Sequence, residues 1–103
     1  MTRNDALFAA LAEGKPITYP VMASRHKWYV ELHVSGRDDG VECLATYTSP
    51  NGRRYSVYLT DMTTDVEIYS RNGHLVTAQF PSNRIPSWML SQIDFLRDVL
   101  SNY

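Results

Sequence analysis

The spacing of apolar residues changes twice along this chain, from a helical period to a strand period and back again. Near the start, three apolar residues lie on one helical face: Leu7, Phe8 and Leu11. Gly14 follows them and is a residue that commonly ends helices, so this segment predicts a helix over about 3–13. The next ten residues contain two prolines, which favours an extended connector with an edge strand around 17–19.

Beyond this connector, the apolar period is two, as in strands that are buried on one face. The alternation predicts five strands, at about 27–34, 41–48, 53–60, 65–70 and 74–80. The segments between them, SGRDDG, PNG, DMTT and RNG, are short enough for hairpins. We therefore expect an antiparallel meander.

The PNG and RNG loops each have three residues and end in glycine, which predicts the register of the strands that they join. They set Tyr47 opposite Tyr55 and Ile68 opposite Val76. Carried through the other two loops, this register predicts one apolar row across the sheet: Val30, Ala45, Val57, Ile68 and Val76. A slip of one residue would move a strand's apolar side chains to the wrong face.

After Pro86 the helical period returns and predicts a helix over about 86–101, whose apolar stripe contains Met89, Ile93, Leu96 and Leu100. Asp94, Arg97 and Asp98 lie off the centre of this stripe, and we expect them to face water. Both helices can cover one face of the sheet. We therefore expect a single α+β domain over 1–103, with both helices packed on one face of a five-stranded antiparallel sheet, in the order α-β5-α.

The composition is that of an ordinary globular protein, with 44% hydrophobic and 20% charged residues. The one cysteine, Cys43, allows no internal disulfide and fits a reducing compartment. No apolar run approaches the ~20 residues of a membrane span, and the first residues do not resemble a signal peptide. These features predict a cytoplasmic protein that does not enter a membrane.

Residues with catalytic or metal-binding chemistry are few and scattered. The three histidines lack the spacing of metal ligands, and Cys43 falls on the core face, where a thiol is usually inert. The predicted register makes His33 and Glu42 neighbours on the open face, a pair that is more often a surface charge contact than an acid–base pair. No glycine cluster precedes a helix. We therefore expect no enzymatic activity, no cofactor and no metal ion.

The strand alternation places several large side chains on the face that the helices leave open: Tyr29, Leu44, Tyr58, Tyr69 and Leu75. Cross-strand packing that stabilises the sheet is one explanation for them. The other is a contact surface, to which tyrosine contributes area and a hydrogen-bonding tip.

The formal net charge is only −1, but a meander separates the charges. One end of the sheet collects basic residues alone: Arg25, His26, Lys27, Arg53, Arg54, Arg71 and His74. The opposite end collects Asp38, Asp39, Glu42, Asp61 and Asp65 against Arg37. Since such polarity steers docking, we expect a partner site that combines tyrosines with the basic end. Its candidate residues are Arg25, Lys27, Tyr29, Arg53, Arg54, Tyr58, Tyr69 and Arg71.

Our main hypothesis is a small non-enzymatic protein that binds a protein partner stoichiometrically, as an adaptor or an inhibitor. Such an inhibitor could be one carried by a phage or mobile element, for example an anti-defence protein. This assignment rests on base rates for small domains and on no particular residue. The alternative is binding of single-stranded or structured nucleic acid by the same face. A homodimer through that face, or a small-molecule pocket near Trp28, Tyr47 and Trp88, remains open, although rings of this kind usually fill the core.

Overall fold

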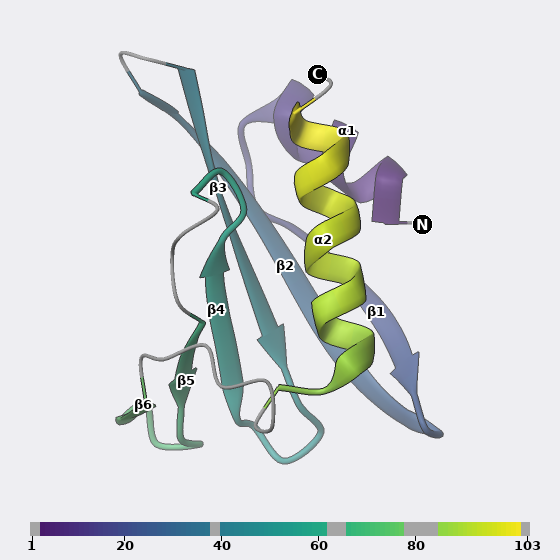
Figure 1. Ribbon diagram of the computed structural model, residues 1–103, viewed down its shortest axis with the longest axis vertical. Helices are drawn as coiled ribbons and strands as arrows, with labels where there is room; N and C mark the ends of the chain where they lie inside the picture. Colours follow the sequence, from purple (N-terminus) through teal and green to yellow (C-terminus); the bar gives the residue numbers. More distant parts are fainter. Residues whose placement is uncertain (1–2, 38–39, 62–65, 78–84, 102–103) are drawn as a thin grey trace.

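The computed structural model describes residues 3–37, 40–61, 66–77 and 85–101. It confirms the α+β fold: one antiparallel sheet has a helix from each end of the chain packed on one face (Figure 1). The elements are α1 (Arg3–Glu13), β1 (Ile17–Ala23), β2 (His26–Arg37), β3 (Gly40–Thr48), β4 (Arg54–Tyr58), β5 (Glu67–Tyr69), β6 (Leu75–Thr77) and α2 (Ser87–Ser101). Strand order across the sheet follows chain order, as expected of a meander.

The helices end and begin where the sequence predicts. Gly14 has a positive φ of 66°, and its amide donates to the carbonyl of Ala10 at 3.0 Å, which closes the last turn of α1. Pro86 lies just before α2, and its carbonyl accepts from the amides of Met89 and Leu90. The predicted apolar stripes of the two helices pack into the core that they share with the sheet, except that Phe8 of α1 is 46% exposed.

A sixth strand is the main addition to the five that were predicted. The edge strand expected around 17–19 runs over Ile17–Ala23 and pairs with β2 along its whole length. Pro20 fits there because an edge strand leaves one row of backbone amides unpaired, so a missing N–H costs little. Ser24 and Arg25 join β1 to β2, and both have positive φ, 51° and 69°. Two such residues are typical of a tight type I′ turn.

The register around the PNG loop is confirmed, with Tyr47 opposite Tyr55. The apolar row predicted across the sheet is wrong, however, because the β2–β3 pairing and the β4–β5 pairing are each shifted by two residues from the predicted register. Val30 lies opposite Tyr47, and Ile68 lies opposite Tyr55. The observed row on the core face is therefore Tyr19, Val30, Tyr47, Tyr55 and Ile68. An even shift leaves each side chain on its predicted face, because alternation has a period of two.

The last strand departs from the prediction in a different way. Ser70 donates from its amide to the carbonyl of His74 at 2.8 Å, as the RNG loop predicts. A register shift between β5 and β6 then places Thr77, and not Val76, opposite Ile68. Val76 is consequently 46% exposed rather than part of the core. The remainder of the strand predicted at 74–80 lies outside the described residues.

Aromatic rings fill one end of the core between the sheet and α2. The Trp28 and Trp88 ring centroids are 5.1 Å apart in an edge-on arrangement, and Tyr47 lies 5.9 Å from Trp88. Farther along α2, Oε1 of Gln92 accepts a hydrogen bond of 3.3 Å from the hydroxyl of Tyr19 in β1. These rings therefore act chiefly in packing, as the alternative to a pocket at Trp28, Tyr47 and Trp88 anticipated.

Arg97 is a correction to the predicted water-facing side of α2. Its side chain is only 7% exposed, and Nη2 donates to the carbonyl oxygens of Tyr58 at 3.2 Å and Asp61 at 3.1 Å. Asp94 and Asp98 are exposed, as predicted. A helix position off the apolar stripe is buried here because the end of β4 offers carbonyl acceptors that need a donor.

Candidate partner-binding surface

One row of side chains crosses the open face of the sheet near its basic end. Its members lie opposite one another, strand by strand: Pro20, Tyr29, Thr48, Arg54, Tyr69 and Leu75. We call this set the tyrosine–arginine row. Tyr29 is 51% exposed and Leu75 is 53% exposed, so large apolar surface remains open to solvent in it. The row unites three of the predicted site residues, Tyr29, Arg54 and Tyr69.

A depression of about 440 Å³ lies along the middle of this row. Its lining is mostly polar and comes from β2, β3, β4, β5 and the turn before β6: Glu31, Thr46, Thr48, Arg54, Ser56, Tyr69 and Gly73. The hydroxyls of Thr46 and Ser56 are 3.4 Å apart in it. This open-face depression offers a guanidinium, a carboxylate and several hydroxyls to a group that enters it.

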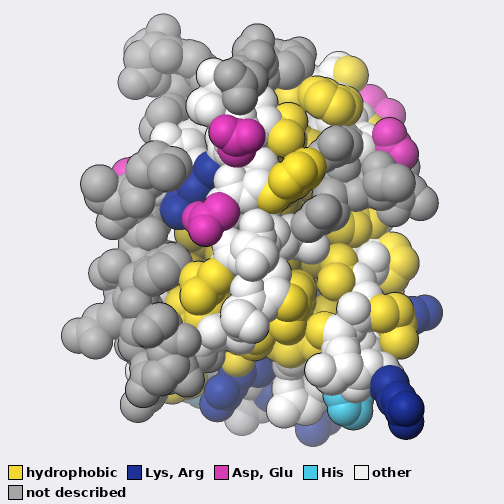
Figure 2. Space-filling view, turned by 45° about the vertical axis from the view of Figure 1, so that its right-hand side comes forward, with side chains coloured by type: hydrophobic (Ala, Val, Ile, Leu, Met, Phe, Trp, Pro, Cys, Tyr) yellow, Lys and Arg dark blue, Asp and Glu magenta, His cyan; other side chains and the backbone are white. Residues whose placement is uncertain are grey.

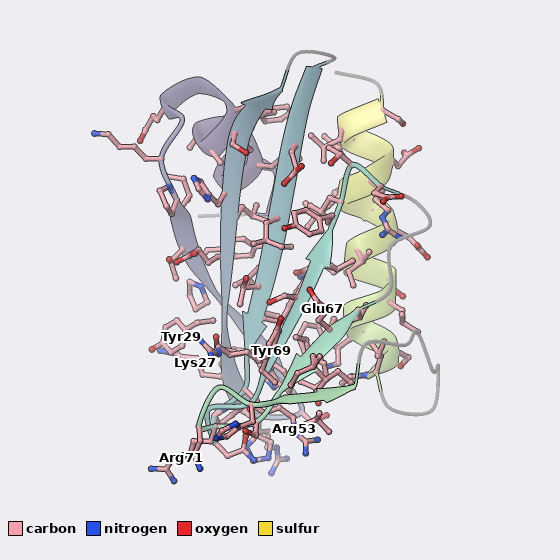
Figure 3. The ribbon with its side chains drawn as sticks, turned by 90° about the vertical axis from the view of Figure 1, so that its left-hand side faces the viewer. Lys27, Tyr29, Arg53, Glu67, Tyr69 and Arg71 are labelled. Carbon is pink, nitrogen blue, oxygen red and sulfur yellow. The ribbon has the colours of Figure 1, made fainter. Side chains whose placement is uncertain are left out.

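Arg54 and Tyr69 are held together on this face. The guanidinium carbon of Arg54 lies 6.0 Å from the centre of the Tyr69 ring, within the range of a cation–π contact. The Tyr69 hydroxyl donates to Oε2 of Glu67 at 3.2 Å (Figure 3). Desolvation on the sheet, followed by the charge and hydrogen bond of Glu67, raises the pKa of Tyr69 above its ordinary value. Tyr69 is therefore a hydroxyl donor with a fixed direction.

The two three-residue turns beside the row pack against each other. A Cβ at Gly52 would lie 3.2 Å from Cγ of Arg71, and a Cβ at Gly73 would lie 3.3 Å from Nη2 of Arg54. Each turn thus receives an arginine from the neighbouring strand or turn at a position where glycine leaves room. Both glycines also have the positive φ that these turns require, 91° and 85°. Arg54 of the row and Arg71 beside it are thus positioned by backbone that the turns determine.

The adjacent residues Arg53 and Arg54 point to opposite faces of the sheet. Arg53 belongs to a second depression, of about 340 Å³, on the side that carries the helices. Its lining comes from the start of β2, from the turn between β3 and β4, and from β4: His26, Trp28, Ser49, Pro50, Asn51, Arg53 and Tyr55. We call it the helix-side depression. Of the three rings near which the sequence leaves a pocket open, Trp28, Tyr47 and Trp88, Trp28 lines this depression. Alternation puts His26, Trp28, Arg53 and Tyr55 on one face, but no sequence pattern indicated that they form a site.

The remaining candidate residues are divided by the fold. Lys27 and Arg71 lie at the same end of the sheet as the row (Figure 3), and Arg25 lies in the turn between β1 and β2. All three side chains are exposed. Tyr58 lies opposite Leu44 at the far end of β4, so Ser56 separates it from Arg54 along the open face. Tyr58 therefore lies outside the row, on the same face of the sheet.

The basic end forms as expected from the meander. Most of the Lys, Arg and His side chains seen in Figure 2 gather at the lower end of the molecule, and Asp and Glu side chains lie in its upper half. Of the acids assigned to the opposite end, Glu42 and Asp61 are described, and Asp38, Asp39 and Asp65 lie outside the described residues. Charge and tyrosine rings thus meet at one end of the sheet.

The other chemical candidates do not form a site in the described part of the chain. His33 lies opposite Leu44, and Glu42 lies opposite Ser35, so His33 and Glu42 are diagonal neighbours on the open face and not directly opposite as the predicted register has them. Within the described ranges, no three His, Cys, Asp or Glu residues are close enough to hold a metal ion. Cys43 is fully buried, and burial raises the pKa of its thiol to about 12. Such a thiol is a poor nucleophile.

Neither described helix is long and apolar enough to cross a membrane. Comparison of the chain with models of protein families, with curated proteins and with solved structures finds no match.

Proposed function

We propose that this protein acts by binding a protein partner in a fixed ratio, as an adaptor or an inhibitor. The observation that carries the proposal is the tyrosine–arginine row, in which Tyr29, Arg54 and Tyr69 share one exposed line across four strands. The row adjoins the basic end of the sheet, which supplies the electrostatic attraction for a partner with an acidic surface.

The physical argument is that these side chains offer contact area at low entropic cost. Tyrosine has few rotatable bonds, and tyrosine and arginine are enriched among the residues that dominate binding energy at interfaces. Arg54 is already placed by Tyr69 and by the turn at Gly73, so little freedom remains to be lost on binding. The open-face depression beside it can receive a side chain of the partner.

Nucleic acid is the second candidate, because tyrosines and arginines on a sheet can stack on bases and contact phosphates. Glu31 lines the depression, and Glu67 lies on the same face beside Tyr69. Two carboxylates within the contact surface would repel a phosphate backbone. A protein surface, which carries donors, acceptors and charges of both signs, suits this lining better.

Affinity capture with matched variants tests the proposal. The wild-type chain, a Tyr29→Ala/Tyr69→Ala double variant and a Phe8→Ala control would be immobilised and exposed to lysate of the native host, with and without nuclease. Phe8 is a suitable control because it is 46% exposed on α1, away from the row. We expect the wild type and the control to retain a protein after nuclease treatment, and the double variant to lose it.

Three results would count against this function. Equal retention by the double variant would exclude the row, and capture that nuclease abolishes would support the nucleic-acid alternative. A wild-type mass in solution of twice the 11.8 kDa of one chain, reduced to one chain by the double variant, would instead assign the row to a homodimer.

A further inference from the structure

We propose that the helix-side depression is a second binding site, which takes an aromatic side chain adjacent to a carboxylate in a peptide segment of the partner. It lies on the opposite face of the sheet from the tyrosine–arginine row and shares no lining residue with the open-face depression. The proposal therefore does not depend on the function assigned to that row.

The floor of the site is aromatic and rigid. Trp28 and Tyr55 have ring centroids 5.7 Å apart at an interplanar angle of 45°, and both line the depression. Trp88 of α2 packs edge-on against Trp28 from the core and holds it in place. Tyr55 is nearly buried, whereas Trp28 remains partly exposed and presents ring surface to solvent. A third ring can add to this arrangement by an edge-to-face or offset contact.

The rim carries positive charge. His26 and Arg53 are exposed at the rim, and the described residues that line the site include neither Asp nor Glu. The turn oxygens are occupied locally: Oγ of Ser49 and Oδ1 of Asn51 accept from the backbone amide of Arg53, at 3.0 and 3.3 Å. The Arg53 guanidinium is thus the permanently charged donor that this rim offers to an incoming anion.

Size and charge together select the ligand. A volume of about 340 Å³ lies at the small end of the range for ligand pockets and suits one ring with a short polar group. One guanidinium matches the single charge of a carboxylate, which it can bind through two parallel hydrogen bonds. A phosphate monoester carries nearly two negative charges and would leave part of its charge uncompensated here.

The position of the site also bears on how a partner would be held. Arg53 and Arg54 are consecutive, but their side chains line depressions on opposite faces of the sheet. A partner with one segment bound in each depression would therefore contact both faces of this end of the sheet. Two linked contacts strengthen binding without either being strong, provided that the segments can reach both sites at once.

Titration with small probes tests the site without an identified partner. The backbone amide and indole N–H signals of the isotopically labelled chain would be followed by NMR during addition of N-acetylphenylalanine, N-acetylphenylalaninamide, acetate or adenosine monophosphate. We expect N-acetylphenylalanine to shift the indole signal of Trp28 and the amide signals of residues 49–53. The neutral amide should bind about threefold more weakly, because an exposed ion pair contributes only modestly to affinity, and acetate should cause no comparable shift.

Matched charge variants separate this site from general electrostatic attraction. Arg53→Gln should reduce the affinity for N-acetylphenylalanine to that for the amide. Lys15→Gln removes an equal charge just before β1, at the other end of that strand from the 24–25 turn, and should leave the affinity unchanged.

The proposal is overturned if no probe shifts these signals up to its solubility limit. It is also overturned if Arg53→Gln binds N-acetylphenylalanine as tightly as the wild type does, or if the wild type binds the acid and the amide equally tightly. Tighter binding of adenosine monophosphate than of N-acetylphenylalanine would also overturn it, in favour of a nucleotide site. Loss of capture by Tyr29→Ala/Tyr69→Ala does not bear on these titrations, so the two proposals fail separately.

Discussion

Arg97 of α2 donates a hydrogen bond of 3.2 Å to the carbonyl oxygen of Tyr58, the last residue of β4. The same nitrogen donates to the carbonyl of Asp61 at 3.1 Å, so one guanidinium joins the helix to the chain where it leaves the sheet. The side chain is only 7% exposed, and a buried charge needs acceptors; Nη2 finds two here, whereas Nε has none among the described residues.

We predict that Arg97→Ala lowers the free energy of unfolding by about 3 kcal/mol, because it removes a buried side chain together with its hydrogen bonds to the carbonyls of Tyr58 and Asp61 and opens a cavity. Urea denaturation followed by circular dichroism would measure the change. Asp94→Ala on the exposed side of α2 should stay within about 0.5 kcal/mol of the wild type. If Arg97→Ala were equally mild, the described hydrogen bonds would not stabilise the fold.

Substitutions in the turn between β1 and β2 should increase the stability of the protein. Ser24 and Arg25 both occupy the left-handed region, where asparagine and glycine are favoured. Replacing them together, Ser24→Asn with Arg25→Gly, should stabilise the protein by about 1 kcal/mol in thermal or urea unfolding. Arg25→Ala keeps a Cβ in the same conformation and should bring no comparable gain. Equal stabilities of the two variants would show that the gain does not come from the backbone.

The contact between the two turns predicts a difference between two glycines with positive φ. A Cβ at Gly14 would meet no atom within 4 Å, so Gly14→Ala should lower the free energy of unfolding only by the cost of placing alanine at positive φ, about 1 kcal/mol. Gly52→Ala should cost about 1 kcal/mol more, since its Cβ would lie 3.2 Å from Cγ of Arg71. Adding Arg71→Ala to Gly52→Ala should recover part of this difference in urea unfolding. If Arg71→Ala did not restore stability to Gly52→Ala, the whole loss would come from the backbone conformation of the turn.

Cys43 should resist thiol reagents in the folded protein. With a pKa of about 12, about one thiol in ten thousand is ionised at pH 8, and the side chain is fully buried. Iodoacetamide should therefore label the native chain far more slowly than the chain in urea, as measured by mass spectrometry. The raised pKa also means that stability falls as pH rises above about 9, because the unfolded thiol loses its proton first. Rapid native labelling would contradict the burial.

The Tyr69 hydroxyl should titrate above its ordinary pKa. Glu67→Gln removes the charge that disfavours ionisation, so it should lower the pKa of Tyr69 while leaving the effect of desolvation. The ¹³Cζ signal of Tyr69 would report the change in an NMR titration. Glu13→Gln, an exposed position on α1, serves as the control and should leave that titration unchanged. An unchanged pKa in Glu67→Gln would mean that the hydroxyl does not bond to Glu67.

The faces of the strands could be predicted, and the pairings only in part. The PNG loop determines its own hairpin because both strands share its geometry, so Tyr47 faces Tyr55. The sequence between β4 and β5 has no proline or glycine to specify a turn, and the observed partner of Ile68 is Tyr55, two residues from the predicted Val57. The gathering of Tyr29, Arg54 and Tyr69 into one row, and the separation of Tyr58, depend on these shifts in register.

The sequence by itself determined the order of the elements, the face to which the residues of β2, β3, β4 and β5 point and the end of the sheet that is basic. These follow from periodicity and from turn residues, which act over a few neighbouring positions. Only the tertiary structure decided which residues become neighbours across strands and which polar groups are buried. Register, the bulge that exposes Val76, and the burial of Arg97 against the end of β4 each depend on how distant segments fit together. No local pattern carries that information, so both depressions appear only in the folded chain.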